Sequence, residues 1–408
     1  MRRILIVAAT TGYQTRMFVE AAGRLGYEVA LATDRCHVLA DPWGDRAIPL
    51  RFDDPGGSAA RVAETAAVDG IVALGDRPAY VASVIAQRLG VLYNSPESVR
   101  ACRDKHLMRE RFRAFGLNVP DYRRVPMDDD PAPHSRQAAY PCVLKPLGLS
   151  ASRGVIRADN PGEFVAAFER IGAILKSPDV ARLRERQDEY IQIESFIPGR
   201  EFALEGLLAG GRLHAIAVFD KPDPLDGPYF EETIYVTPSR AAAATWQALV
   251  DAAQQAATAL GLTEGPVHAE MRVNEGGVRM LEVAARPIGG LCARVLPELP
   301  ETILRHAAGE RPARIPHLDG AAGVMMIPVP RAGIYERTDG IDAALAVAGV
   351  EDVVITAKQG QRLEPLPEGN SYPGFIFARG NTPQAVERSL REAHAQLSFE
   401  IREALPVL

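Results

Sequence analysis

A short β-hairpin that carries two glutamates constrains the fold of this chain more than any other feature. Two runs rich in Val, Leu and Met flank residues 275–277, whose sequence Glu-Gly-Gly is typical of a tight turn. A three-residue turn pairs Asn274 with Val278. The same register places Glu270 directly opposite Glu282, with both carboxylates on one face. A four-residue turn would separate them.

Like charges opposite each other destabilise a sheet. A Mg²⁺ ion, which prefers a few carboxylates together with substrate phosphates, removes that conflict. The hairpin therefore predicts a site that holds a metal and a nucleotide.

Composition and charge exclude several classes of protein. The 408 residues are too many for one typical core and suggest roughly two to four packed domains. A net charge of −6 argues against nucleic acid as the main partner. The first apolar run is too short for a signal peptide, and no run approaches the ~20 apolar residues that span a membrane. Cys36, Cys102, Cys142 and Cys292 lack CxxC spacing, which indicates reduced thiols in a cytoplasmic protein and no zinc site.

The first hundred residues alternate short apolar runs with helical periodicity, a pattern typical of a parallel sheet covered by helices. The expected strands are residues 3–8, 26–31 and 70–74, and the expected helices are residues 13–25 and 78–89. We therefore predict an N-terminal α/β domain over residues 1–100.

The rest of the chain mixes strands and helices without strict alternation. Residues 126–141 are rich in Asp and Pro and predict a mobile connection or an edge. The pattern resets near residue 321, and an amphipathic helix follows an N-cap at Thr382. We therefore predict a separate C-terminal lobe over residues 321–408.

Lys145 ends an apolar strand and precedes a loop of small residues, 148–154, which we call the phosphate loop. A lysine beside such a loop can neutralise phosphate oxygens while backbone N–H groups bind them. No GxxxxGK[ST] motif is present, so this is not a Walker motif. A solvated lysine on a surface hairpin is the alternative, and the downstream carboxylate pair favours the phosphate site.

Residues 192–201 predict a strand, a tight turn and a second strand. Such a hinge can offer backbone groups to an adenine edge while Glu201 accepts hydrogen bonds from ribose. His268 shares the strand face of Glu270, where it either contacts substrate or hydrogen-bonds a carboxylate.

Arg286 shares strand parity with Glu282 if the strand continues that far. It either holds a carboxylate or phosphoryl group or forms a structural ion pair. Gly289 and Gly290 follow and allow a close approach of backbone to a ligand.

Lys221 and Glu232 lie on a long connection before the hairpin. Long loops often carry specificity, so Glu232 is a candidate substrate contact. We expect most of the other charges on this connection to be solvated.

The order of these motifs closely resembles that of the ATP-grasp superfamily, and within it the carboxylate–amine ligases, especially the L-amino-acid ligase group. The motifs are Asp104-Lys105 with Met108, Val143-Leu144-Lys145-Pro146 with the phosphate loop, Glu194-Ser195-Phe196-Ile197 with Gly199-Arg200-Glu201, and Glu270 and Glu282 with Arg286. The resemblance covers residues 1–330 well, and residues 374–379 with the helix after them are similar to the C-terminal lobe of that group.

The resemblance implies an α/β and α+β chain with the ATP-grasp fold. The implied parts are an N-terminal Rossmann-like parallel α/β domain at 1–100, ATP-grasp subdomains at 101–190 and 191–320, and a small C-terminal α+β lobe at 321–408.

The resemblance also implies roles for individual residues. Lys105 and Lys145 would contact ATP phosphates, Ser152, Arg153 and Gly154 would lie in the loop that closes over them, Glu194, Phe196 and Ile197 would line the adenine pocket, and Glu201 would bind ribose. Glu270 and Glu282 would hold Mg²⁺ or alternatively Mn²⁺, Arg286 would stabilise an acyl-phosphate and its tetrahedral adduct, and His268, Glu232, Gly289 and Gly290 would face substrate. Many relatives have Asn two residues after the second glutamate, where this chain has Ala284, so one metal ligand is missing.

The implied activity is an ATP-dependent ligase that activates a carboxylate, such as an amino acid, as an acyl-phosphate and joins it to an amine. The products would be an amide or dipeptide, ADP and phosphate. The alternatives are a carboxylase of the biotin carboxylase or purine-pathway type, for which no biotin-carrier motif is visible, and a nucleotide-binding module without turnover. The expected partners are small molecules, with a homodimer as a further expectation for this type of protein.

Overall fold

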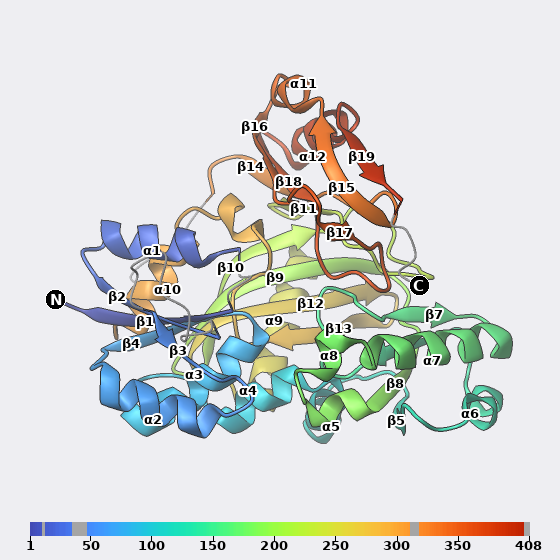
Figure 1. The fold of residues 1–408 in the computed structure, drawn as a ribbon, viewed down its shortest axis with the longest axis horizontal. Helices are drawn as coiled ribbons and strands as arrows, with labels where there is room; N and C mark the ends of the chain where they lie inside the picture. Colours follow the sequence, from blue (N-terminus) through green and yellow to red (C-terminus); the bar gives the residue numbers. More distant parts are fainter. Residues whose placement is uncertain (10–12, 35–46, 311–317, 404–408) are drawn as a thin grey trace.

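The computed structural model describes residues 1–9, 13–34, 47–310 and 318–403 (Figure 1). The N-terminal sheet is parallel, with the order β3-β2-β1-β4. Its strands are β1 (Arg3–Ala8), β2 (Glu28–Thr33), β3 (Ile48–Pro49) and β4 (Gly70–Leu74), and its helices are α1 (Thr15–Arg24), α2 (Pro55–Thr65), α3 (Asp76–Leu89) and α4 (Pro96–Arg103). Figure 1 shows α1 on one face of the sheet and α2 and α3 on the other. Because β1 is covered on both faces, it reads as one apolar run, and the predicted parallel sheet is confirmed.

A small subdomain, residues 122–195, has an antiparallel sheet of order β5-β8-β6-β7 and its own apolar core. Its elements are β5 (Tyr122–Pro126), α6 (Pro131–Gln137), β6 (Cys142–Pro146), β7 (Ile156–Ala158), α7 (Pro161–Leu175), α8 (Pro178–Ala181), the 3₁₀ turn η1 (Arg186–Glu189) and β8 (Tyr190–Ser195), and α5 (Lys105–Ala114) leads into it. The predicted connection at 126–141 contains α6, because Asp130 caps that helix by accepting a hydrogen bond from the N–H of Ala132 at 3.0 Å. The predicted connection thus contains a helix, and it begins at the end of β5, the edge strand of this sheet.

The largest sheet has eight strands in the order β13-β12-β9-β10-β11-β14-β18-β16. These strands are β9 (Arg200–Ala209), β10 (Arg212–Asp220), β11 (Ile234–Thr237), β12 (Gly265–Asn274), β13 (Gly277–Ala284), β14 (Ala321–Met326), β16 (Val350–Ile355) and β18 (Gly374–Gly380). The helical elements of this half are α9 (Ala243–Leu260), η2 (Cys292–Val295), α10 (Leu299–Ala307), α11 (Ile341–Leu345) and α12 (Pro383–His394), and β15 (Gly333–Asp339), β17 (Arg362–Leu363) and β19 (Ser398–Arg402) form a separate three-stranded sheet. The domain boundary at residue 321 stays a prediction, but the sheet continues across it, because β11 pairs with β14.

The hairpin of β12 and β13 has the predicted pairing of its two glutamates but a shorter turn than predicted. Asn274 pairs with Gly277 rather than with Val278, so the turn has two residues and the predicted turn is wrong. This shift alone would move the partner of Glu270 by one position. A β-bulge beside Glu270 adds one residue to β13 and restores Glu282 as its partner. The predicted pairing of the two glutamates is therefore confirmed.

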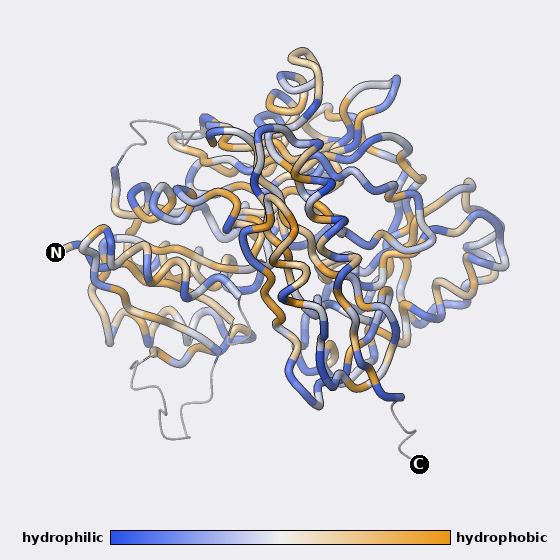
Figure 2. The backbone as a smooth tube through the Cα atoms, turned by 90° about the horizontal axis from the view of Figure 1, so that it is seen from above, coloured by the Kyte–Doolittle hydropathy of each residue, from blue (hydrophilic) through white to orange (hydrophobic). Residues whose placement is uncertain are grey.

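Hydrophobic stretches alternate with hydrophilic ones throughout the chain (Figure 2). Within the described residues, no helix is long and apolar enough to cross a membrane. Cys102, Cys142 and Cys292 are buried free thiols, as expected, whereas Cys36 lies outside the described residues.

Candidate active site

One cavity of about 600 Å³ lies where the N-terminal sheet, the small subdomain and the eight-stranded sheet meet. The predicted site residues that line it are Lys105, Lys145, Ser152, Arg153, Glu194, Phe196, Ile197, Glu201, Glu232, His268, Glu270, Glu282, Arg286, Gly289 and Gly290. Gly154 is not among the lining residues, and its N–H donates to the carbonyl of Pro367 at 2.9 Å. Residues that the sequence places on separate strands and loops thus line one cavity.

Three cations and one carboxylate form what we call the phosphate side: Lys105, Arg109, Lys145 and Glu194. Arg109 donates from Nε and Nη2 to the two carboxylate oxygens of Glu194, at 2.8 and 3.2 Å. Lys145 forms a close ion pair with the same carboxylate. Burial opposes the charge of Glu194, but the two cations outweigh it and hold its pKa at about 2. Glu194, predicted to line the adenine pocket, thus uses its carboxylate to anchor two cations.

Burial acts in the opposite direction on Lys145. Removal from water disfavours its ammonium, and Glu194 offsets this only in part, so the pKa of Lys145 falls to about 8. The lysine is buried rather than solvated. The alternative of an exposed lysine on a surface hairpin is therefore wrong.

Lys105 contacts both the phosphate loop and the hairpin of β12 and β13. It is the first residue of α5, after the N-cap Asp104, and its Nζ donates to the carbonyl of Leu149 at 2.8 Å. The same Nζ lies 3.4 Å from Oε2 of Glu282. Lys105 is thus fixed between the two parts that would enclose phosphate groups.

The phosphate loop contains two consecutive non-glycine residues in the left-handed region. Ala151 and Ser152 have φ angles of 55° and 54°, a conformation that costs about 1–3 kcal/mol per residue and concentrates at functional sites. Arg153, the next residue, pairs with Asp179 at 2.6 Å. Gly154 has φ +72°, and a Cβ there would lie 2.8 Å from Pro146. The loop therefore holds one specific shape against the end of β6.

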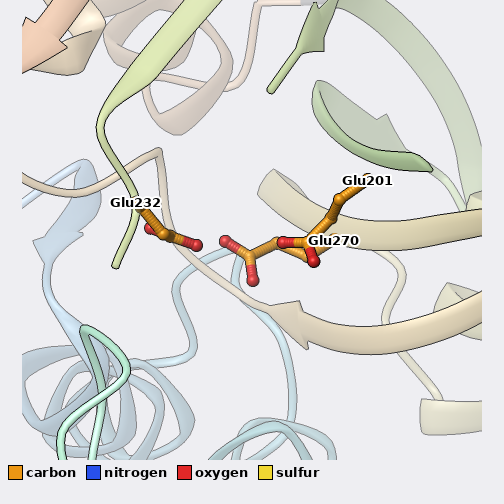
Figure 3. A group of neighbouring side chains, drawn as sticks. All are labelled: Glu201, Glu232 and Glu270. Atoms are coloured by element: carbon orange, nitrogen blue, oxygen red, sulfur yellow. The ribbon is translucent and has the colours of Figure 1, made fainter. Parts of the chain in front are cut away.

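Three carboxylates surround Lys221, and we call these four residues the acidic side. The Nζ of Lys221 lies 2.7 Å from Glu201, 2.6 Å from Glu232 and 3.2 Å from Glu270. Figure 3 shows the three carboxylates turned toward one another. Burial disfavours the ammonium, but the three carboxylates outweigh it and raise the pKa of Lys221 well above its usual value. The expectation that this lysine is solvated is therefore wrong.

The predicted adenine hinge is held by Arg272, which the sequence did not single out. Its Nε donates to Glu201 at 2.9 Å and its Nη1 donates to the carbonyl of Ile197 at 2.7 Å. Its guanidinium also lies over the ring of Phe196, 5.2 Å from the centroid. Glu201, the predicted ribose ligand, therefore already binds two cations, Lys221 and Arg272.

Arg286 forms a bidentate ion pair with Asp76, at 2.9 and 3.2 Å. Burial opposes its charge, but Asp76 outweighs burial and raises the pKa of the guanidinium further. The structural ion pair, one of the two alternatives from the sequence, is present, and Arg286 also lines the cavity. Strand β13 ends at Ala284, so the parity argument for Arg286 is wrong. Gly289 has no atom within 4 Å of an added Cβ, so a ligand can approach the backbone there.

His268 lies between two carboxylates. Its Nδ1 is 2.7 Å from Glu205 and its Nε2 is 3.3 Å from Glu270. Burial disfavours the imidazolium, but both carboxylates outweigh it and raise the pKa of His268 to about 9. His268 therefore carries a proton at neutral pH and serves as a hydrogen-bond partner on the cavity wall.

Glu270 and Glu282 are paired across β12 and β13 and both line the cavity, and carboxylates are ligands that Mg²⁺ prefers. Glu282 is partly exposed, and the ion pair that it forms among the described residues is the long one with Lys105. Glu201, Glu232 and Glu270 also have oxygens within 4.8 Å of one another, but the ammonium of Lys221 lies among them, within 3.2 Å of each carboxylate. The donor set therefore favours the hairpin pair as the metal ligands. Ala284, where relatives often have Asn, is buried and offers no ligand.

Arg109, Asp76, Glu205 and Arg272 are the residues that sequence reasoning missed. Each of them carried a signal. Arg109 lies four residues after Lys105, on the same helix face, and Asp76 follows the carboxyl end of a parallel strand, where ligands usually bind. Glu205 has the strand parity of Glu201, and Arg272 has that of His268 and Glu270.

Residues 138–295 match the ATP-grasp domain, and residues 325–402 match the L-amino acid ligase C-terminal domain 2. The uncharacterized protein y4rH of Sinorhizobium fredii is 24% identical over 98% of this chain and 84% of its own length. The alanine–anticapsin ligase of Bacillus subtilis is 28% identical over 50% of this chain, and the match spans only 45% of that enzyme.

The fold is also that of a solved relative. The L-amino acid ligase of Bacillus licheniformis superposes with a TM-score of 0.85 and 27% identity, over 99% of each chain. The predicted ATP-grasp fold is confirmed. The chain contains an ATP-grasp domain, followed by a C-terminal domain of the L-amino acid ligase type.

Proposed function

We propose that this protein is an ADP-forming ligase that activates a carboxylate with ATP and joins it to an amine. One observation carries the proposal: a single cavity brings together two buried lysines, a strained loop of small residues, a pair of facing glutamates and an arginine held by an ion pair. An amino acid is the proposed carboxylate, by similarity to the alanine–anticapsin ligases and the L-amino acid ligase.

The residues have distinct tasks in this reaction. A carboxylate oxygen attacks the γ-phosphorus of ATP and ADP leaves, giving an acyl-phosphate; the amine nitrogen then attacks the acyl carbon, phosphate leaves and the amine loses a proton. Lys105 and Lys145 would neutralise the phosphate oxygens. Arg286, held in place by Asp76, would stabilise the oxyanion of the tetrahedral adduct.

Glu270 and Glu282 would hold Mg²⁺, which when bound offsets the charge on the transferring phosphoryl group. The two glutamates come from adjacent strands with a fixed register, so their spacing does not depend on a mobile loop. His268 and Lys221 contact Glu270 and would keep its carboxylate ionised and oriented.

The test is release of ADP and phosphate with Mg²⁺-ATP against a panel of amino acids, singly and in pairs. We expect release that requires a particular pair and an amide product of the matching mass. Glu282→Gln removes a metal ligand and should abolish release, whereas Glu275→Gln, on the exposed turn of the same hairpin, should not.

Other outcomes would contradict the proposal. AMP and pyrophosphate as products would exclude an acyl-phosphate. Release that depends on bicarbonate instead of an amine would favour the carboxylase alternative, and nucleotide binding without turnover under all conditions would favour a binding module.

A further inference from the structure

A loop of the C-terminal domain, residues 364–372, contacts both the phosphate loop and the cavity. The carbonyl of Pro367 accepts from the N–H of Gly154 at 2.9 Å, and the carbonyl of Glu368 accepts from Nε of Arg153 at 2.8 Å. Asn370 and Tyr372, later in the same loop, line the cavity. This one loop therefore connects the nucleotide end of the site to its wall on the C-terminal side.

The carboxylate of Glu368 adds a connection to the small subdomain. Arg170, on α7, donates from Nε and Nη2 to its two oxygens, at 2.5 and 2.9 Å. A bidentate pair of this kind is among the stronger charged hydrogen bonds. The same guanidinium donates to the hydroxyl of Tyr229 and lies over its ring, 5.2 Å from the centroid. Arg170 thus joins the small subdomain to two separate parts of the larger body.

These contacts fall directly after the strained part of the phosphate loop. Ala151 and Ser152 hold left-handed backbone, which persists only where the surroundings fix it. The two residues that follow, Arg153 and Gly154, are the ones bound by residues 367 and 368. The C-terminal loop therefore supplies part of the surroundings that fix the phosphate loop.

We propose that residues 364–372 form a latch that keeps the phosphate loop closed over the nucleotide, with Glu368 as a positioning residue that acts through Arg170. The inference builds on the proposed ligase function, because a closed loop protects an acyl-phosphate from water. A substrate that packs against Asn370 or Tyr372 orders the same latch. Closure of the phosphate loop then depends on whether a substrate is bound near Asn370 and Tyr372. ATP cleavage therefore stays coupled to amide formation.

The first test measures hydrogen exchange of peptides covering residues 147–157, with Mg²⁺ and a non-hydrolysable ATP analogue. Glu368→Gln should speed exchange by about threefold, the size expected for loss of a partly exposed ion pair. Glu364→Gln is the matched control, because Glu364 lies in the same loop but pairs with Arg362 of its own domain. The double reversal Arg170→Glu with Glu368→Arg should restore slow exchange.

Three results would overturn the latch: wild-type exchange in Glu368→Gln, equal acceleration in both glutamate variants, or no recovery in the double reversal. Equal acceleration would mean that the C-terminal domain has loosened as a whole. Because the exchange experiment needs no amide product, it stands even if the ligase function fails.

The second test applies once a substrate pair is known. Glu368→Gln should release more phosphate per amide formed and raise KM for ATP by about threefold, while kcat for phosphate release stays close to the wild-type value. A fall in kcat with unchanged coupling would instead show a purely structural role for Glu368.

Discussion

Two buried lysines have opposite electrostatic surroundings: Lys145 lines the cavity, and Lys221 pairs with three carboxylates that line it. Lys145 shares one carboxylate, Glu194, with the competing cation Arg109, and its pKa falls to about 8. Lys221 is the one cation of the acidic side as defined above, and it contacts all three carboxylates of that side. Its pKa therefore rises well above its usual value. The phosphate side thus has three cations for one carboxylate, and the acidic side has the reverse. The first suits a polyphosphate, and the second suits the neighbourhood of a metal cation.

The largest expected effect is a difference in unfolding free energy between variants of the two lysines. Lys221→Met leaves one buried and two partly buried carboxylates without their shared cation and should cost about 3–5 kcal/mol of unfolding free energy. Lys145→Met leaves Glu194 with Arg109 and should cost clearly less. Urea unfolding at pH 7 measures both, with the exposed Lys176→Met as the control, since Lys176 pairs with Asp128 at the surface. Equal losses at Lys145 and Lys221 would contradict the contrast.

The next effect concerns where the metal is held. Glu282→Gln should weaken Mn²⁺ binding to the nucleotide complex by about tenfold or more, because a carboxylate ligand is lost. Glu232→Gln should change it far less, because the carboxylate of Glu232 already serves Lys221. Electron paramagnetic resonance of bound Mn²⁺ distinguishes the two variants. A larger effect at Glu232 than at Glu282 would instead make Glu232 a metal ligand.

The smallest effect is a pH dependence of nucleotide binding that comes from Lys145 on the phosphate side. Lys145 loses its proton as the pH rises through about 8, and the charged form is the one that favours phosphate. Affinity of the free protein for Mg²⁺-ATP should therefore fall by about tenfold between pH 7 and pH 9. Calorimetric titration at both values measures this change. Lys145→Arg should remove it, because a guanidinium stays charged, and an unchanged slope in that variant would assign the effect elsewhere.

Features that depend on one segment of chain could be predicted from the sequence. The hairpin, the lysine at the end of β6 and the loop after it are set by local patterns. Even there, the pairing of Glu270 with Glu282 results from two departures that cancel, a shorter turn and a bulge. Turn length and bulges depend on packing against the neighbouring strand, and alternation of residue types does not contain that information.

Features that depend on distant segments could not be predicted. The sequence around Lys221 predicts an ordinary loop charge, because none of its three partners is close to it in the chain. They lie on β9, on β12 and at the far end of its own connection. Arg109 and Glu194 are 85 positions apart, and Arg286 and Asp76 are 210 apart. In each case a charge is buried because an opposite charge arrives from elsewhere in the fold, and only tertiary structure brings the two together.

The shared eight-stranded sheet limits how this protein can be divided or recombined. Strand β11 registers with β10 at a single pair, Asp220 with Val236, and with β14 over four residues. A chain cut before Ala321 would leave β11 as an open edge, and exposed edges of this kind pair with other chains and aggregate. The C-terminal domain therefore cannot be exchanged between homologues by itself. A chimera would have to include β11 and the connection before it, which carries Lys221 and Glu232, along with the strands that complete the sheet.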